Sequence, residues 1–124
     1  MRDKARDFFE EAKVLCAAKK FNGAASRLYY SLYHGIVAGF EDNGIKQSDL
    51  TRKVDPEKSG YWLHEIVRDC STLAGVERRD AGFIRAAWKL RVKSDYEDKH
   101  VMPADCIDLI PRVKKILGDL DVSI

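Results

Sequence analysis

One stretch of the chain, residues 24–40 with the sequence AASRLYYSLYHGIVAGF, constrains the fold most, because its apolar side chains recur at the 3.6-residue spacing of an α-helix. The small and apolar residues that share one side of this helix are Ala24, Ala25, Leu28, Leu32, Gly35, Ile36, Gly39 and Phe40. Arg27, Tyr30 and His34 point the other way, within an arc of roughly 60°. The stretch therefore predicts a central helix that uses two of its faces.

The second face allows two interpretations. In the first, Arg27, Tyr30 and His34 belong to a packing surface against another helix or a second subunit. In the second they form a site, because a permanent cation, a phenol and an imidazole that titrates near neutrality lie together. The spacing alone agrees with both interpretations.

Helical periodicity recurs in four other segments, at about residues 5–20, 61–74, 79–96 and 103–120. Asn22-Gly23 predicts a tight reversal after the first helix, and Asn43-Gly44 predicts a turn after the second. The polar residues 42–59 then form a long loop, of a length that often lines or covers a site. The predicted fold is all-α: one domain over residues 1–124, an up-and-down bundle of about five helices with this long loop between helices two and three.

Four details of this bundle can be compared with the structure. We expect Trp62 to be a surface or interface aromatic and His64 to be solvated, because both lie partly off the apolar stripe of the third helix. Pro111 should kink or briefly break the fifth helix, since proline removes a backbone donor. Residues 121–124 should be frayed.

On the fourth helix, Arg91 falls in the middle of an apolar arc. A guanidinium turned toward an apolar surface must be paired or must face a polar cleft, because burying it without a partner is very costly. Asp95, one turn further on, is the obvious local partner. Arg91 is therefore either half of an ion pair that orders the end of the helix or an anion-binding residue at a cleft.

Composition narrows the class of protein. A net charge of +2 gives no overall basic field, so any nucleic-acid binding must depend on a local cluster. The three cysteines have no CxxC or Cys/His metal spacing, which indicates packed thiols in a reducing, cytoplasmic location and predicts neither metal nor cofactor. No apolar run approaches the roughly 18 residues of a membrane span.

Two segments carry a family resemblance. Residues 24–35, AASRLYYSLYHG, resemble the second-helix signature of small prokaryotic HEPN-domain proteins, and residues 90–96, LRVKSDY, resemble their fourth-helix signature. The order and separation of the five predicted helices agree as well. The resemblance implies a helical bundle and three kinds of function: a metal-independent ribonuclease, a toxin paired with a small nucleotidyltransferase-like protein, or a module that only binds nucleotides or partners.

Catalytic members of that family carry arginine, four to six residues and then histidine, usually on the fourth helix. Here Val92 follows Arg91 and Tyr96 stands five residues on, whereas on helix two six residues separate Arg27 from His34. The candidate catalytic residues are His34, Arg27 and Arg91, and the candidate ligand-binding residues are Tyr30, Asp95 and Tyr96.

These residues suit RNA chemistry without a metal, which needs a base, an acid and cations around the phosphorane. His34 would transfer protons, and Arg27 and Arg91 would hold phosphate oxygens bidentately. One such histidine per chain requires a symmetric homodimer, which the family resemblance also implies. We therefore expect Arg27, Tyr30, His34 and Arg91 to converge on one groove.

Three hypotheses follow. The first is a HEPN-like protein that acts on or binds RNA or nucleotides, with a metal-independent endoribonuclease toxin as its sharpest form. The second is a non-catalytic helical module that binds nucleotides or a partner protein. The third is a helical interaction protein outside the family.

Overall fold

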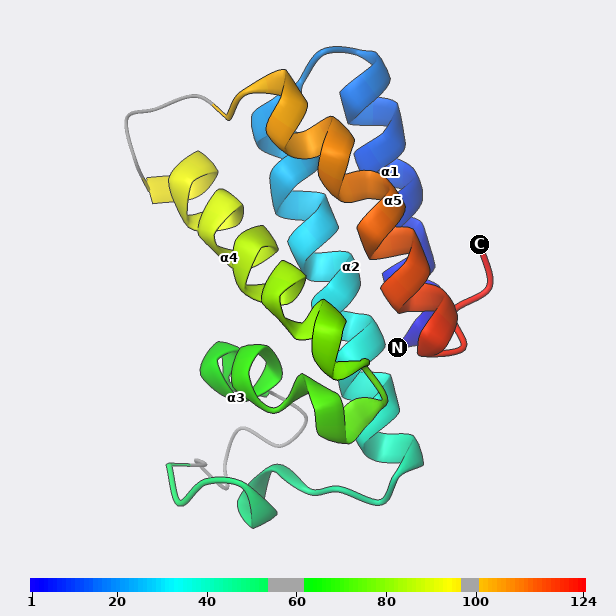
Figure 1. The fold of residues 1–124 in the computed structure, drawn as a ribbon, viewed down its shortest axis with the longest axis vertical. Helices are drawn as coiled ribbons and strands as arrows, with labels where there is room; N and C mark the ends of the chain where they lie inside the picture. Colours follow the sequence, from blue (N-terminus) through cyan, green and yellow to red (C-terminus); the bar gives the residue numbers. More distant parts are fainter. Residues whose placement is uncertain (54–61, 97–100) are drawn as a thin grey trace.

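The computed structural model describes residues 1–53, 62–96 and 101–124, and its helices follow the periodicity of the sequence. The elements in chain order are α1 (Arg2–Ala17), α2 (Phe21–Asp42), the 3₁₀ helix η1 (Gln47–Asp49), α3 (His64–Asp69), the 3₁₀ helices η2 (Ser71–Ala74) and η3 (Arg78–Asp80), α4 (Ala81–Tyr96) and α5 (Pro103–Asp119). The described residues confirm the predicted all-α bundle (Figure 1). Among their helices, none has the length and apolar character needed to cross a membrane.

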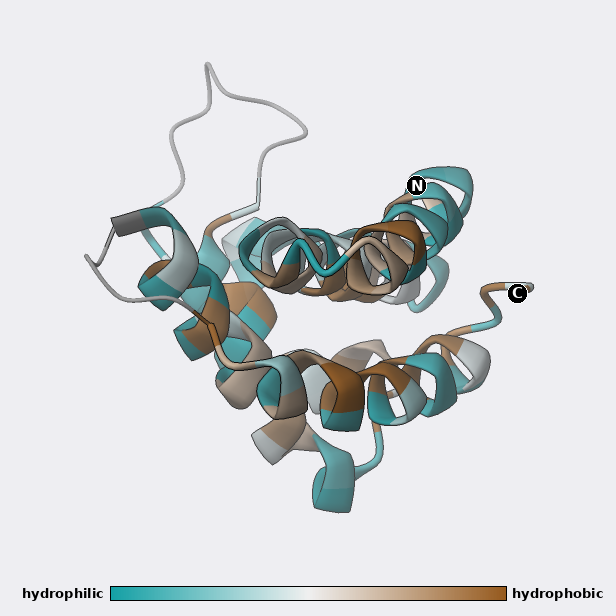
Figure 2. Ribbon diagram, turned by 90° about the horizontal axis from the view of Figure 1, so that it is seen from above, coloured by the Kyte–Doolittle hydropathy of each residue, from teal (hydrophilic) through white to brown (hydrophobic). Residues whose placement is uncertain are grey.

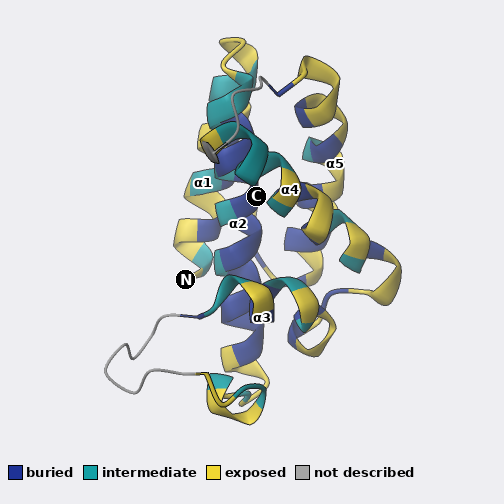
Figure 3. Cartoon of the chain, turned by 90° about the vertical axis from the view of Figure 1, so that its left-hand side faces the viewer, coloured by how far each residue is buried: buried dark blue, intermediate teal, exposed yellow. Residues whose placement is uncertain are grey.

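Helix α2 lies at the centre of the bundle, where it contacts α1, α3, α4, α5 and η2. It is buried on most of its surface and is dark blue over most of its length in Figure 3. Its buried residues are Ala24, Ala25, Ser26, Leu28, Tyr29, Ser31, Leu32, Tyr33, Gly35, Ile36, Val37, Ala38, Gly39 and Phe40. Each large apolar side chain among them contributes about 1.5–3 kcal/mol by leaving water. From above, hydrophobic parts of the helices turn toward the middle and hydrophilic parts outward (Figure 2).

The turn between α1 and α2 differs from the prediction. Helix α2 already begins before Asn22, so Asn22 and Gly23 are helical, and Lys19 takes the positive φ, of 60°. Lys19 and Lys20 therefore lie in the turn rather than in the last turn of α1. The side-chain oxygen of Asn22 accepts a hydrogen bond from the backbone N–H of Val101 at 2.8 Å. Asn22 thus connects the start of α2 to the segment before α5, a role that no local turn signal could indicate.

The third helix is shorter than predicted, because α3 ends at Asp69 and the chain continues into the 3₁₀ helix η2. Leu73, in η2, is exposed. Gly75, which follows η2, has a φ of 118°, in the left-handed region that glycine adopts without steric cost. The surface position expected for Trp62 is wrong: its ring stacks on Phe40, with the centroids 4.7 Å apart. The Tyr33 hydroxyl also donates to the carbonyl of Trp62 at 2.6 Å. Contacts with α2 thus bury a side chain that the local periodicity placed outside.

In α5 and at its C-terminal end, the apolar side chains at heptad spacing are all buried: Cys106, Leu109, Val113, Ile116 and Leu120. The helix is continuous through Pro111, which lies on its exposed side, so the expected break is absent.

The expectation that residues 121–124 are frayed is also wrong. Asp121 takes a φ of 62° and lets the N–H of Val122 reach the carbonyl of Leu117 at 2.9 Å. Val122 is buried, and its apolar side chain therefore holds the end of the chain on the bundle.

The long loop after α2 is only partly described. Its first part contains η1, whose Gln47 accepts a hydrogen bond from the N–H of Leu63 through Oε1 at 2.6 Å. Residues 54–61 lie outside the described residues, and so do residues 97–100 between α4 and α5. The expectation that the loop lines or covers a site remains an expectation.

Candidate functional site

Arg91 is the centre of the candidate site. Its Nη2 donates to the hydroxyl of Tyr30 at 2.9 Å, and its Nε donates to Asp95 Oδ2 at 3.2 Å. The guanidinium carbon lies 5.2 Å from the ring centroid of Tyr30 and 5.5 Å from that of Tyr29. The Arg91 side chain is only 12% exposed. Its contacts with Tyr29, Tyr30 and Asp95 compensate the free-energy cost of removing the guanidinium from water. The predicted pair of Arg91 and Asp95 is confirmed.

Tyr29 connects this arginine to a histidine. The Tyr29 hydroxyl and His64 Nδ1 are 2.5 Å apart and share a hydrogen bond whose donor depends on the histidine tautomer. The His64 ring also lies against Tyr33 and Tyr30, with centroid separations of 5.1 and 6.3 Å. The solvated His64 expected from the sequence is therefore wrong, because α3 places the side chain over the aromatic face of α2.

The environment sets the charge of these groups. Burial lowers the pKa of His64, and the positive charge of Arg91 lowers it further, so its imidazole is neutral near pH 7. Burial raises the pKa of the Tyr29 phenol well above its usual value, against the smaller opposing effect of Arg91. The cluster therefore combines one permanent cation, a neutral imidazole and a neutral phenol.

His34 has a different set of neighbours. Its ring stacks on Phe8 of α1 with the centroids 5.4 Å apart and an interplanar angle of 3°, and it meets Tyr33 edge-on at 5.2 Å. Nδ1 of His34 is buried and has no hydrogen-bond partner among the described residues. Burial lowers the pKa of this imidazole, and the charges of Lys4 and the N-terminus lower it further. Within the described residues, no hydrogen bond or ring contact joins His34 to Arg91.

Arg27 points toward α1. Its Nε donates to Glu11 Oε2 at 2.9 Å, and its side chain is 40% exposed. The expected convergence of Arg27, Tyr30, His34 and Arg91 on one groove is thus wrong in part: Tyr30 and Arg91 meet, whereas the other two contact α1. Arg27, Tyr30 and His34 share one arc of α2, as predicted, but from Arg27 to His34 they extend along roughly 10 Å of the helix. Helix α1 crosses that length and covers both ends of it.

Two candidate ligand-binding residues lie at the end of α4. Asp95 is exposed, and its carboxylate pairs with the guanidinium of Arg91. Tyr96 is the last residue of α4, and its side chain lies outside the described part. Arg91 and Asp95 therefore form an ion pair that is partly open to solvent.

Sequence reasoning missed three residues of this region: Tyr29, His64 and Phe8. Tyr29 stands next to Tyr30 in the Tyr-Tyr pair, so the signal was present. No sequence signal points to His64 or Phe8, because each reaches the site only through tertiary contacts with α2. Among the described residues no group of three or more Asp, Glu, His or Cys side chains has the arrangement of a metal site.

Comparison with known proteins adds one finding. A family model described as HEPN domain matches residues 1–122 of the 124-residue chain. No curated protein and no solved structure matches it. The match covers α1 to α5 and the whole of the candidate site.

Proposed function

The chain belongs to the HEPN family, and from that premise we propose that it binds RNA or nucleotides, with a phosphate held by Arg91. The observation that carries this proposal is the orientation of the guanidinium, fixed by the Tyr30 hydroxyl at 2.9 Å and by the rings of Tyr29 and Tyr30. An arginine fixed in this way is preorganised for bidentate contact with phosphate oxygens. A ligand phosphate would replace the carboxylate of Asp95.

Replacement of Arg91 by lysine tests the proposal. Arg91→Lys keeps the positive charge but loses the planar donor pair and the stacking on the tyrosine rings, so we expect affinity for labelled single-stranded RNA or a nucleotide to fall about tenfold. Fluorescence anisotropy over a salt series measures it. The matched control is Arg85→Lys on the same helix, whose side chain is 56% exposed and paired with Asp69.

Asp95 provides a second readout of the same proposal. If its carboxylate occupies the phosphate position, Asp95→Asn removes a competing anion, and binding should become tighter rather than weaker. Equal affinities for the wild type, Arg91→Lys and Arg85→Lys chains, with circular dichroism unchanged, would contradict binding at Arg91.

A second candidate function is metal-independent RNA cleavage, and the hydrogen bond between Tyr29 and His64 favours it. A neutral imidazole beside an arginine can accept the proton of a 2′-hydroxyl, while the arginine holds the phosphate. His64 is therefore a better-placed proton carrier than His34, which the sequence suggested. In this mechanism His64 takes the proton of the 2′-hydroxyl, and Arg91 stabilises the phosphorane that forms as the 2′-oxygen attacks phosphorus. When the bond from phosphorus to the 5′-oxygen breaks, the protonated imidazole returns the proton to that oxygen, and Tyr29 fixes the imidazole throughout.

Cleavage assays with a chelator present decide between binding and catalysis. We expect His64→Ala to lower the rate of RNA cleavage by about two orders of magnitude or more, the usual scale for loss of a general base. His34→Ala is the matched control, and a loss confined to His34→Ala would restore the assignment made from the sequence. Absence of cleavage in the wild type would leave binding as the function.

Only the second candidate function, RNA cleavage, implies a role as a toxin. A toxin paired with a nucleotidyltransferase-like protein would stop growth when expressed alone, and the His64→Ala chain would not. The three cysteines, all free thiols, support a reducing, cytoplasmic location as part of the proposal. A homodimer is also part of it, although Phe8 packs on the Tyr30 and His34 rings that had suggested the contact surface.

A further inference from the structure

A row of aromatic rings follows the seam between α1 and α2 and ends beside Arg91. The row consists of Phe8, Tyr30 and His34, all half-buried, and we call it the aromatic strip. Phe8 lies against both of the others, with its ring centroid 5.9 Å from that of Tyr30 and 5.4 Å from that of His34. The Tyr30 hydroxyl accepts the hydrogen bond from Arg91 at 2.9 Å. The strip therefore connects the site at Arg91 to the surface of α1.

The register of the two helices determines what lies at the other end of the strip. Helices α1 and α2 run antiparallel (Figure 1), and Glu11 pairs with Arg27 on the side near the turn between them. Phe8, about one turn earlier on α1, contacts His34, further along α2. Lys4 precedes Phe8 by about one more turn. Lys4 is therefore placed beside the His34 end of the strip.

This end of the strip carries an unpaired positive charge. Lys4 is exposed, and among the described residues it has no ion-pair partner, because its neighbours Asp3 and Asp7 pair with Arg6. Burial lowers the pKa of His34, and the charge of Lys4 lowers it further. The imidazole is therefore neutral near pH 7. The strip is thus an uncharged aromatic surface with a cation at each end.

Such a surface fits one strand of nucleic acid. The bases of a single strand are free to stack on aromatic side chains, whereas the bases of a duplex are already stacked and paired. The phosphates on either side of a stacked base are anionic, so they suit the cations at the two ends. An apolar protein surface would cover the rings equally well but would leave both cations without an anion. The charges therefore favour RNA over a protein partner.

We propose that the aromatic strip binds a nucleobase of single-stranded RNA beside the phosphate held by Arg91, and that Lys4 contacts a neighbouring phosphate. The proposal rests on the proposed function, and it narrows the ligand from nucleotides in general to a single strand of two or more. Phe8 supplies the stacking surface, because it stands on α1, outside the hydrogen bonds that fix Arg91. The ring of His34 supports it, at an interplanar angle of 3°.

Two labelled strands test the contact with the base. Both have about six nucleotides and carry 2′-O-methyl groups, which remove the attacking hydroxyl; one has adenine throughout, and the other is abasic with the same number of phosphates. We expect the wild type to bind the adenine strand at least about tenfold more tightly, measured by fluorescence anisotropy. Phe8→Leu should remove most of this difference and leave the affinity for the abasic strand unchanged.

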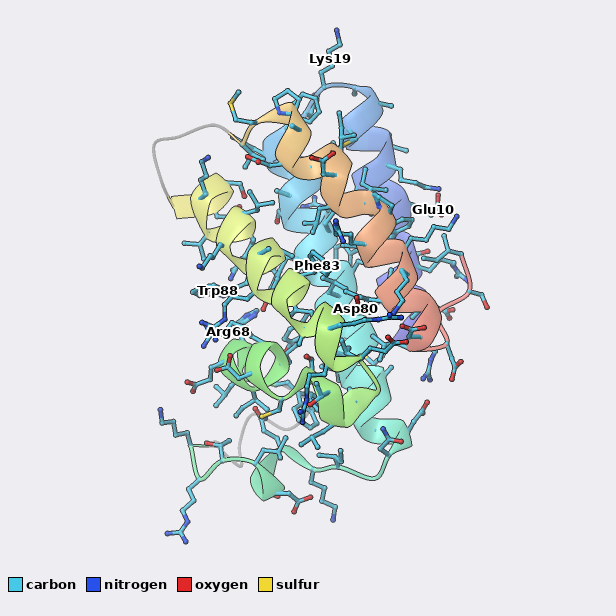
Figure 4. All side chains as sticks on the ribbon, viewed as in Figure 1. Glu10, Lys19, Arg68, Asp80, Phe83 and Trp88 are labelled. Carbon is cyan, nitrogen blue, oxygen red and sulfur yellow. The ribbon has the colours of Figure 1, made fainter. Side chains whose placement is uncertain are left out.

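The matched control for Phe8→Leu is Phe83→Leu in α4. The Phe83 ring is also half-buried, but it lies on the α5 side of α4 (Figure 4), where Arg112 lies over it at 4.2 Å. This variant should keep the full difference between the two strands. Circular dichroism checks that each variant is folded.

Lys4→Gln provides a second measurement at an exposed position. Loss of one phosphate contact should reduce the slope of log affinity against log salt concentration by about 0.7, for both strands. The control is Lys19→Gln, because Lys19 projects from the end of the molecule beyond the turn between α1 and α2 (Figure 4). That variant should keep the wild-type slope. An unchanged slope in Lys4→Gln would refute the contact with Lys4.

The outcomes separate this inference from the proposed function. Equal binding of both strands by the wild type, with Arg91→Lys weakening both, overturns the contact with the base and keeps the phosphate at Arg91. A loss in Phe8→Leu no greater than in Phe83→Leu overturns it as well. A wild type that binds neither strand, or binding that Arg91→Lys leaves unchanged, overturns both proposals. If Phe8→Leu does not fold, the two strands on the wild type and on Lys4→Gln decide.

Discussion

The two histidines of α2 and α3 show, at the residue scale, how neighbours decide a side chain's role. His34 and His64 are both about half-buried and both lie on aromatic rings of α2 or α1. His64 has the Tyr29 hydroxyl as a partner, whereas the buried Nδ1 of His34 has none among the described residues. The hydrogen bond fixes the orientation of the His64 imidazole, whereas His34 is held by packing against aromatic rings.

These environments predict that the protein is less stable in mild acid. Burial lowers the pKa of both His34 and His64 below 6.5 in the folded chain, so the unfolded chain binds protons first as the pH falls through 6.5. The free energy of unfolding should therefore decrease from about pH 7 to about pH 5, a range above most carboxylate titration. Urea denaturation at several pH values measures it.

A double variant tests the assignment of this pH dependence. His34→Gln/His64→Gln removes both titrating groups and should flatten the curve in that range. A slope that persists in the double variant would show that other groups cause it.

At the element scale, the glycines of α2 record how closely neighbouring elements approach. A Cβ at Gly39 would lie 2.3 Å from the carbonyl oxygen of Ala74 in η2, and a Cβ at Gly35 would lie 3.0 Å from Leu117 of α5. Glycine inside a helix costs roughly 0.5–1 kcal/mol relative to alanine. At Gly39 and Gly35 the absence of a Cβ lets η2 and α5 pack directly against α2.

Gly39→Ala should therefore destabilise the protein although alanine favours helix. The added methyl group overlaps backbone that cannot move without shifting η2, so we expect a loss of about 1–3 kcal/mol in the free energy of unfolding. Gly118→Ala in α5 is the matched control, because a Cβ there meets nothing within 4 Å. That variant should gain about 0.5–1 kcal/mol. A stabilised Gly39→Ala chain, measured in denaturant, would refute the close contact.

At the scale of the whole molecule, the two ends of the chain are held together across the bundle. Nε of Arg2 donates to the carbonyl of Leu120 at 3.1 Å, and Val122 packs beside Gly35 of α2. The N- and C-terminal ends lie at the same end of the bundle in Figure 1. The cluster around Arg91 is therefore held between helices that are themselves fixed by contacts far apart in the sequence.

The sequence by itself determined the features that depend on neighbours within one or two helical turns. The 3.6-residue period predicted α1, α2, α4 and α5, because a helix buries whichever stripe is apolar. The spacing of Arg91 and Asp95 predicted their ion pair, and Asn43-Gly44 predicted the turn that follows α2.

Only the tertiary structure decided which residues meet across helices. His64 reaches Tyr29 across 35 positions of the sequence, and Phe8 covers His34, because the crossing of α1, α2 and α3 brings them together. Trp62 is buried for the same reason. Periodicity specifies the face a side chain occupies but not the element that will cover that face, since helix crossings result from packing over the whole chain.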